Sequence, residues 1–189
     1  MLTRKEYQEA QRRALFYLEQ AGVVLAESER TKIEVSDFGL SHLHHQGAQI
    51  LTFFNTDRLS AKVIVLFPWQ VLPEHWHPAV GRDMGKEEVV RVRWGEVYLY
   101  IPGPPTPNPK AKIPPGEERN FTVWQEVVLR PGDQHVIPPE TVHWFQAGEG
   151  GAVIDDYSSA ARDLLDGFTN PKVVRETRIV EEDPKKKAS

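Results

Sequence analysis

The sequence predicts an all-β protein, an antiparallel sandwich or barrel preceded by one helix. From residue 33 onward, short runs rich in β-branched and aromatic residues alternate with Gly, Pro, Asn and Asp, as in QILTFFNTD, AKVIVLFPW and FTVWQEVVLRPGD. Many short strands with closely spaced turns are typical of such folds. The 189 residues and 40% hydrophobic content fit one domain with a sizeable core. We therefore expect a single domain over residues 1–189, with the barrel at about 33–158.

The N-terminal segment has the pattern of an amphipathic helix. Thr3 and Glu6 form a capping-box pattern, and a Gly follows at position 22. Between them the apolar positions recur at helical spacing: Tyr7, Ala10, Ala14, Leu15, Leu18 and Ala21. These observations predict a helix from about residue 5 to 20, within a helical region of about 3–21.

Two further segments depart from the strand pattern. IPGPPTPNPKAKIPPGEE is too rich in Pro and Gly for a central strand, so we interpret it as a long excursion over the barrel that could act as a lid. After residue 158, ARDLLDGF predicts a short helix, NPKVVRETRIVEED an edge strand, and DPKKKAS a frayed tail.

Composition excludes several classes of function. With 23 Lys and Arg against 27 Asp and Glu, the chain has no electrostatic reason to bind nucleic acid. Its longest apolar run, residues 63–67, is far too short to span a membrane, and its charged N-terminus is unlike a secretory signal. With no Cys, a metal site would use His, Asp and Glu, and we expect a cytoplasmic protein. Fifteen Pro and two Met favour high thermal stability.

A candidate metal site begins at EHWHP. Because successive strand residues point to opposite faces, His75 and His77 share a face while Trp76 takes the other. Glu88 lies on the following strand, and Gly95 follows it at the spacing expected of a hairpin partner. In PGDQHVIPPETVHWF, a turn leads to His143 on a later strand. Three His and one Glu are then available to one ion.

These motifs resemble the cupin superfamily. HxH, Glu-x6-Gly (Glu88 to Gly95) and a Gly132 motif ending at His143 occur in the expected order. The resemblance implies a cupin-type antiparallel β-barrel, or jelly roll, and metal ligation by His75, His77, Glu88 and His143. Two features depart from the common pattern: Glu140 replaces the usual second-motif Gly, and the intervals from His77 to Glu88 and from Gly95 to Gly132 are long.

The same departures resemble the D-lyxose isomerase family, as do NTDRLSAK, FPWQVLPEHWHP, GKEE, VIPPETVHWF and DDYSSAARD. This resemblance covers about residues 37–183. It implies an aldose–ketose isomerase that interconverts D-lyxose and D-xylulose, and also D-mannose and D-fructose, by metal-assisted proton transfer through an enediol. It further implies a homodimer. The ligand types suit Mn²⁺, Fe²⁺, Co²⁺, Ni²⁺ or Zn²⁺, and the resemblance favours Mn²⁺.

Isomerisation also needs groups that move protons. Lys86 precedes Glu88 by one strand period, so its ammonium is expected on the metal face, where it would contact substrate. Without the family resemblance, a lysine at a strand entrance would more often extend into solvent. Asp156 matches a family position where a Glu is usual, which makes it the candidate base, with Asp155 and Glu74 as alternatives.

The remaining aromatic and His residues complete the predicted site. Phe145 shares the parity of His143 and should wall the substrate pocket. A second His cluster, SHLHHQG with His42, His44 and His45, lacks a correctly spaced Glu, so we do not assign it to metal. Two other functions stay open: a metal-dependent oxygenase, and a sugar-binding cupin without catalytic activity.

Overall fold

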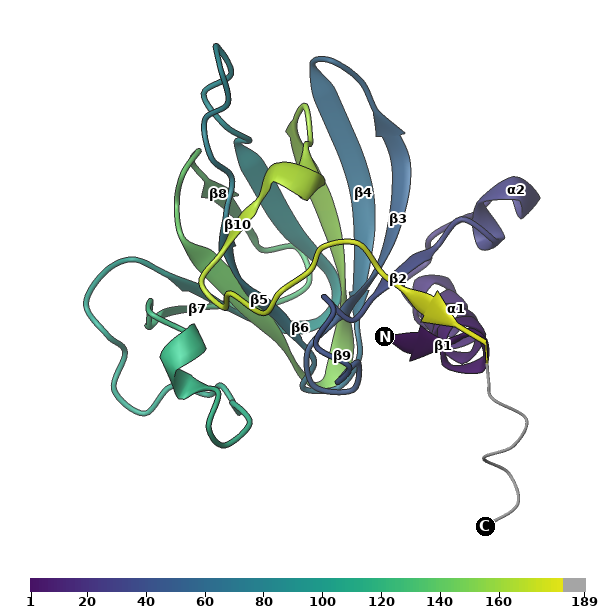
Figure 1. Cartoon of the computed structure of the whole chain (residues 1–189), viewed down its shortest axis with the longest axis horizontal. Coiled ribbons are helices and arrows are strands. Elements are labelled where there is room, and N and C mark those ends of the chain that lie inside the picture. Colours follow the sequence, from purple (N-terminus) through teal and green to yellow (C-terminus); the bar gives the residue numbers. More distant parts are fainter. Residues whose placement is uncertain (182–189) are drawn as a thin grey trace.

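A computed structural model describes residues 1–181, and most of its regular structure is β-strand, as predicted (Figure 1). The strands are β1 Leu2–Thr3, β2 Glu34–Ser36, β3 Ala48–Asn55, β4 Leu59–Leu66, β5 Val71–Trp76, β6 Glu88–Ile101, β7 Gln125–Leu129, β8 Gln134–Ile137, β9 His143–Ser159, β10 Gly167–Phe168 and β11 Ile179–Val180. The helices are α1 Arg4–Gln20, α2 Glu27–Arg30 and the 3-10 turns η1 Glu118–Asn120 and η2 Asp163–Leu165.

One large sheet curls on itself and makes the barrel. Its strands follow the order β10-β5-β9-β4-β3-β2, and β6 pairs with β7, β8 and β9. The 17-residue β9 pairs with β5 at its start, with β4 at its end and with β6 along much of its length. Residues of β4, β5 and β6 therefore meet at β9.

The predicted N-terminal helix is present as α1, with both hydrogen bonds of the Thr3–Glu6 capping box. Its buried residues, Ala10, Ala14, Tyr17 and Leu18, pack on the outer face of β3 and β4 against Leu51 and Val63. A separate apolar core fills the inside of the curl, where Ile64, Leu99 and Phe145 meet. The helix thus covers the outside of the barrel and leaves the interior to the site.

The Pro-rich excursion does not close the barrel, so the expectation of a lid is wrong. Ala111 and Ile113 of the excursion, together with Phe121 and Trp124 just after it, belong to a third apolar cluster with Tyr100 and Trp144. Tyr100 and Trp144 point out of the curl because they alternate with the interior residues Leu99 and Phe145. The excursion therefore covers the outer face of β6 and β9.

A different segment crosses the open side of the curl: residues 160–176, here called the strap (Figure 1). The short helix predicted here is only the three-residue η2, and β10 joins the strap to β5. The predicted edge strand is reduced to β11, which pairs in parallel with β1. The predicted frayed tail, residues 183–189, lies outside the described residues.

Two residues in the motifs have positive φ angles. Gly95 has a φ of 81°, and a Cβ there would lie 2.1 Å from the Gly151 carbonyl oxygen, so the close approach of two strands requires Gly. Glu140, which stands where the cupin motif has Gly, keeps the left-handed conformation with a φ of 60°. Its amide donates to the His77 carbonyl at 3.1 Å. The turn is thus retained although the glycine is not.

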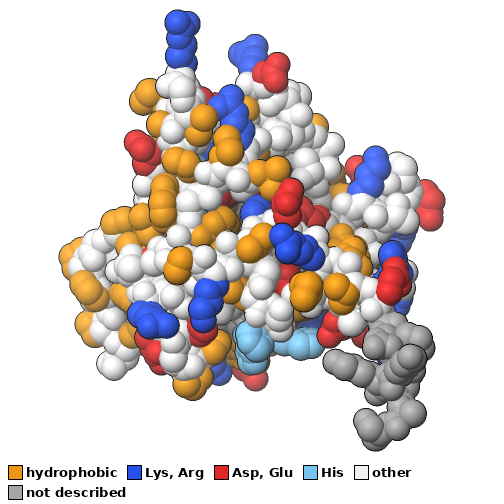
Figure 2. All heavy atoms as spheres, viewed as in Figure 1, with side chains coloured by type: hydrophobic (Ala, Val, Ile, Leu, Met, Phe, Trp, Pro, Cys, Tyr) orange, Lys and Arg blue, Asp and Glu red, His pale blue; other side chains and the backbone are white. Residues whose placement is uncertain are grey.

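The surface gives no sign of a polyanion site on the face drawn in Figure 2, where basic and acidic side chains are interspersed. Within residues 1–181, no helix is both long and apolar enough to cross a bilayer.

Candidate metal centre

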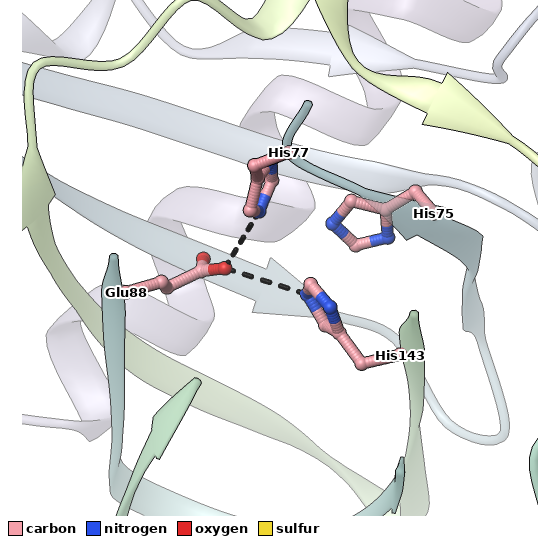
Figure 3. A group of neighbouring side chains, drawn as sticks. All are labelled: His75, His77, Glu88 and His143. Carbon is pink, nitrogen blue, oxygen red and sulfur yellow. Dashed lines mark hydrogen bonds and ion pairs between the residues drawn. The ribbon is translucent and has the colours of Figure 1, made fainter. Parts of the chain in front are cut away.

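The structure brings His75, His77, Glu88 and His143 together inside the curl (Figure 3). One ligand atom from each lies within 4.8 Å of all the others, and all four residues are buried. His75 lies on β5 directly opposite His143, the first residue of β9. Glu88 begins β6, which also pairs with β9. Three strand ends therefore set the geometry that the parity argument predicted.

Each imidazole is oriented by a hydrogen bond at Nδ1. The partner is the Pro73 carbonyl for His75 and the Thr141 carbonyl for His143, both at 2.8 Å. For His77 it is the Asp166 carboxylate, at 2.7 Å. These bonds direct Nε2 of each ring toward the centre of the group, which is how metal-ligating histidines are usually held.

The donor set fits a divalent cation. The Nε2 atom of His143 is buried and makes no hydrogen bond, although it lies 3.4 Å from Glu88 Oε2. His77 Nε2 lies 2.9 Å from the same oxygen. A buried nitrogen lone pair without a partner is costly, and a cation would satisfy it. Three imidazoles with one carboxylate suit Mn²⁺, Fe²⁺, Co²⁺, Ni²⁺ or Zn²⁺.

Electrostatics also prepare His75 and Glu88 for a cation, whereas at His77 burial is outweighed by hydrogen bonds to Asp166 and Glu88, which raise the pKa. Burial lowers the pKa of His75 well below its usual value, and the neighbouring His143 and His77 lower it further. Burial would raise the pKa of Glu88, but Lys86 and the two imidazoles hold it well below its usual range. A neutral imidazole and an ionised carboxylate are the forms that bind metal.

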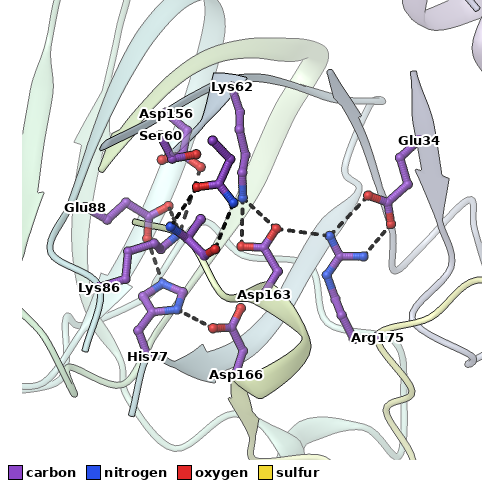
Figure 4. A network of polar contacts seen from close by, with 12 residues as sticks. Glu34, Ser60, Lys62, His77, Lys86, Glu88, Asp156, Asp163, Asp166 and Arg175 are labelled. Atoms are coloured by element: carbon purple, nitrogen blue, oxygen red, sulfur yellow. Dashed lines mark hydrogen bonds and ion pairs between the residues drawn. The ribbon is translucent and has the colours of Figure 1, made fainter. Parts of the chain in front are cut away.

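Lys86 and Asp156 lie beside this group (Figure 4). Lys86 Nζ is 3.2 Å from Glu88 Oε1 and 3.9 Å from Asp156 Oδ2, and both residues are buried. Burial and the nearby Glu88 together raise the pKa of Asp156 to about 7, against the opposing effect of Lys86. Burial would lower the pKa of Lys86, yet Asp156 and Glu88 raise it above its usual value. The pair thus combines a cation with a carboxyl group that titrates near neutral pH.

The two alternative base candidates are engaged elsewhere. Asp155 points to the outer side of β9, where it accepts from Arg93 at 2.9 Å. Glu74 accepts hydrogen bonds from the Thr122 and Val123 amides and from the Thr122 and Thr169 hydroxyls. It therefore ties the excursion and the strap to β5. Neither carboxylate lines the cavity that contains the ligand group.

A cavity of about 40 Å³ adjoins the ligands. Phe145 walls it, as the sequence predicts, together with Phe38, Leu72 and Phe168. A far larger surface groove, about 860 Å³, lies on the other side of the strap and shares Asp163 and Arg175 with the cavity. The strap is thus the wall between the ligand group and an open groove.

Sequence reasoning missed the polar residues of this wall. Lys62 Nζ contacts both oxygens of Asp163, at 2.7 and 2.6 Å, and Arg175 links Asp163 at 3.6 Å to Glu34 (Figure 4). A signal existed for Lys62, because it shares the parity of Ile64 and Leu66, both in the interior core. No such signal marks Asp163 or Arg175, because the strap has little regular structure.

The second His cluster remains outside the site. His42, His44 and His45 are exposed, and among residues 1–181 the only group with metal-binding geometry is that of His75, His77, Glu88 and His143.

Comparisons with known proteins agree with the resemblance seen in the sequence. No family model matches the chain. A D-lyxose ketol-isomerase from Thermofilum sp. (strain ex4484_79) is 52% identical over 95% of this chain and 100% of its own length. A protein of the same name from Cohnella laeviribosi is 51% identical over 90% and 93%. A D-lyxose/D-mannose isomerase from Thermosediminibacter oceani is 46% identical over 93% and 97%.

Solved structures confirm the fold. L-ribose isomerase from Acinetobacter sp. DL28, in complex with L-ribose, superposes with a TM-score of 0.80 at 17% identity, covering 95% of this chain and 98% of that one. The Cellulomonas parahominis L-ribose isomerase gives 0.79 with the same identity and coverage. The cupin-type architecture of sugar isomerases is thus shared at low identity, and the close relatives define the group: the chain belongs to the D-lyxose ketol-isomerase family.

Proposed function

We propose that this protein is a metal-dependent aldose–ketose isomerase that interconverts D-lyxose and D-xylulose, and also D-mannose and D-fructose. The observation that carries the proposal is a buried His₃Glu group with Lys86 and Asp156 beside it in one cavity. The names of relatives that are 46–52% identical give the substrates to test first.

We propose Mn²⁺ as the cation held by His75, His77, Glu88 and His143. When bound, it would polarise neighbouring carbonyl and hydroxyl oxygens of the sugar as a Lewis acid. Hydrogen bonds within the chain already orient the three imidazoles, so the site needs little rearrangement to bind the ion.

Asp156 is the proposed base. Isomerisation removes a proton from C2 and places one on C1, so the base must accept and then release a proton. A carboxyl group with a pKa near the working pH does both, and burial raises the pKa of Asp156 to about 7. Its Oδ1 is buried and has no hydrogen-bond partner, so one oxygen is free to face a substrate C–H.

Lys86 is the proposed partner of the sugar oxygens. Its ammonium would give a proton to O1 and regain one from O2, so that the net exchange of hydrogen between these oxygens balances. Because Asp156 and Glu88 flank Lys86, the ammonium is held in place rather than extended into solvent. Phe145 would contact the carbon side of the sugar.

The cavity wall suits a neutral polyol. Lys62, Asp163 and Arg175 present donors and acceptors on one side, and each charge already has an opposite partner. Aromatic side chains line the other side. Such a wall can hydrogen-bond hydroxyl groups without demanding a charged ligand.

The test is an assay of metal-stripped and Mn²⁺-reconstituted protein on D-lyxose, D-mannose and ribose, with ketose formation as the readout. We expect D-xylulose from D-lyxose only after reconstitution. Oxygen uptake measured in the same reactions separates isomerisation from the chemistry of a metal-dependent oxygenase. Absence of ketose from every aldose, with metal bound, would reject the proposal.

We also propose a cytoplasmic homodimer. Exposed Phe53, Phe54 and Leu59 lie near the turn between β3 and β4, and apolar side chains gathered at a surface often meet another chain. Light scattering on the eluting protein distinguishes one copy from two. The absence of Cys is compatible with a reducing compartment.

A further inference from the structure

The three imidazoles of the ligand group are not held in the same way. His75 and His143 each donate to the carbonyl two residues earlier on their own strand segment, Pro73 and Thr141. His77 follows the last residue of β5, and its Nδ1 partner is Asp166, 89 residues further along the chain. The orientation of one ligand therefore depends on the strap.

The contact is short, enclosed and charged. The Asp166 Oδ1 to His77 Nδ1 distance is 2.7 Å, and the two side chains are 11% and 3% exposed. A carboxylate that accepts from Nδ1 fixes the tautomer with Nε2 free for a metal and makes that nitrogen a stronger donor. The carbonyl partners of His75 and His143 orient their rings without adding a full charge.

The strap is seated closely enough to hold Asp166 in place. The next residue, Gly167, pairs with Trp76, and Phe168 pairs with His75. A Cβ at Gly167 would come within 2.2 Å of the Trp76 ring, so this backbone approaches the ring as only Gly permits. Thr169 then bonds Glu74 through its hydroxyl and amide. Asp166 is thus fixed relative to β5, which carries His75 and ends directly before His77.

We infer that Asp166 is a positioning residue that sets the metal affinity of the site by orienting His77 from the strap. The inference rests on the proposed metal function and deepens it, because it assigns to the strap a part of the metal site. Loss of such a carboxylate partner typically weakens metal affinity by about 10- to 100-fold.

The test measures the Kd for Mn²⁺ itself, by competition with a chelator, in wild-type protein and three variants. We expect Asp166→Ala to weaken binding by about 10- to 100-fold. Asp166→Asn should weaken it less, since its amide oxygen still accepts from Nδ1 but carries no charge. Arg162→Ala is the matched control: it removes an exposed strap contact to Asp83 at 2.9 Å without touching His77, and should leave the Kd within about twofold.

The outcomes separate the two proposals. If wild-type protein binds no divalent metal, the proposed function fails. If wild-type binds and Asp166→Ala binds equally well, the inference about Asp166 fails alone. An Arg162→Ala protein as weak as Asp166→Ala would also overturn it, because general seating of the strap would then explain the effect. The near-isosteric Asp166→Asn keeps the test valid if Asp166→Ala does not fold.

Discussion

Replacing Asp156 by Asn tests the proposed base with little other change to the site. Asp156 is 2% exposed, and Asn has nearly the same volume, so no cavity forms. The change removes only the carboxylate that could take a proton from C2. General base catalysis typically contributes about 10²- to 10⁴-fold, so kcat should fall by that factor, or by roughly 2.7–5.4 kcal/mol in activation free energy. Asp156 is not among the four proposed ligands, so bound metal should remain stoichiometric.

The neighbouring residue provides the matched control. Asp155 has the same side chain but points to the outer face, where it pairs with Arg93. Asp155→Asn should therefore keep kcat within about twofold, since Asp155 does not line the cavity and Asn can still accept from Arg93. A near-normal kcat for Asp156→Asn with full metal content would refute its role as the base. Conversion of lyxose in D₂O gives an independent readout, because transfer through Asp156 should label C1 of xylulose with solvent deuterium.

The other predictions concern the metal, pH, the cavity wall and temperature. His77→Ala should lose metal and activity together, while His44→Ala should keep both, as measured by metal content per chain. Equal losses in the two variants would show that the metal was assigned to the wrong histidine cluster. A base must be deprotonated to act, and the pKa of Asp156 is raised to about 7. The value of kcat/KM should therefore fall as pH drops through about 7, or through a lower pH if the bound cation depresses this pKa. Asp156→Asn should lack this acidic fall in the pH profile. Phe145→Ala should lower the free energy of unfolding by about 3–5 kcal/mol in denaturant titrations, whereas Phe145→Leu should fold and raise KM more than it lowers kcat. Calorimetry should give a Tm above about 65 °C, and a midpoint near 50 °C with metal bound would contradict the composition argument.

The residues of the site that lie on or directly beside strands were predictable, because side chains in a strand alternate between its two faces. Parity placed His75 and His77 on one face and put Lys86 with Glu88, and the structure shows each of these pairs. The N-terminal helix followed from its capping box and apolar spacing. In each case the relevant interaction lies within a few residues along the chain.

The strap could not be placed in the same way. The segment ARDLLDGF predicts a short helix, whereas the chain forms one 3-10 turn and directs the carboxylates of Asp163 and Asp166 into the barrel. Their partners, Lys62 and His77, are 101 and 89 residues away. Likewise, the Pro-rich excursion lies outside the barrel because Tyr100 and Trp144 offer it an apolar face, a match between distant segments that local patterns do not encode.

The burial of the ligand group behind the strap bears on how the protein would acquire its metal. All four ligands are at most 5% exposed, and the ion pair of Lys62 and Asp163 lines the adjoining cavity of about 40 Å³. We expect an ion bound among four buried side chains to exchange slowly with solvent during purification. Affinity alone would then not decide which metal occupies the site. The ion present when the chain folds would stay, and preparations grown in different media should differ in activity until they are heated with chelator and reloaded.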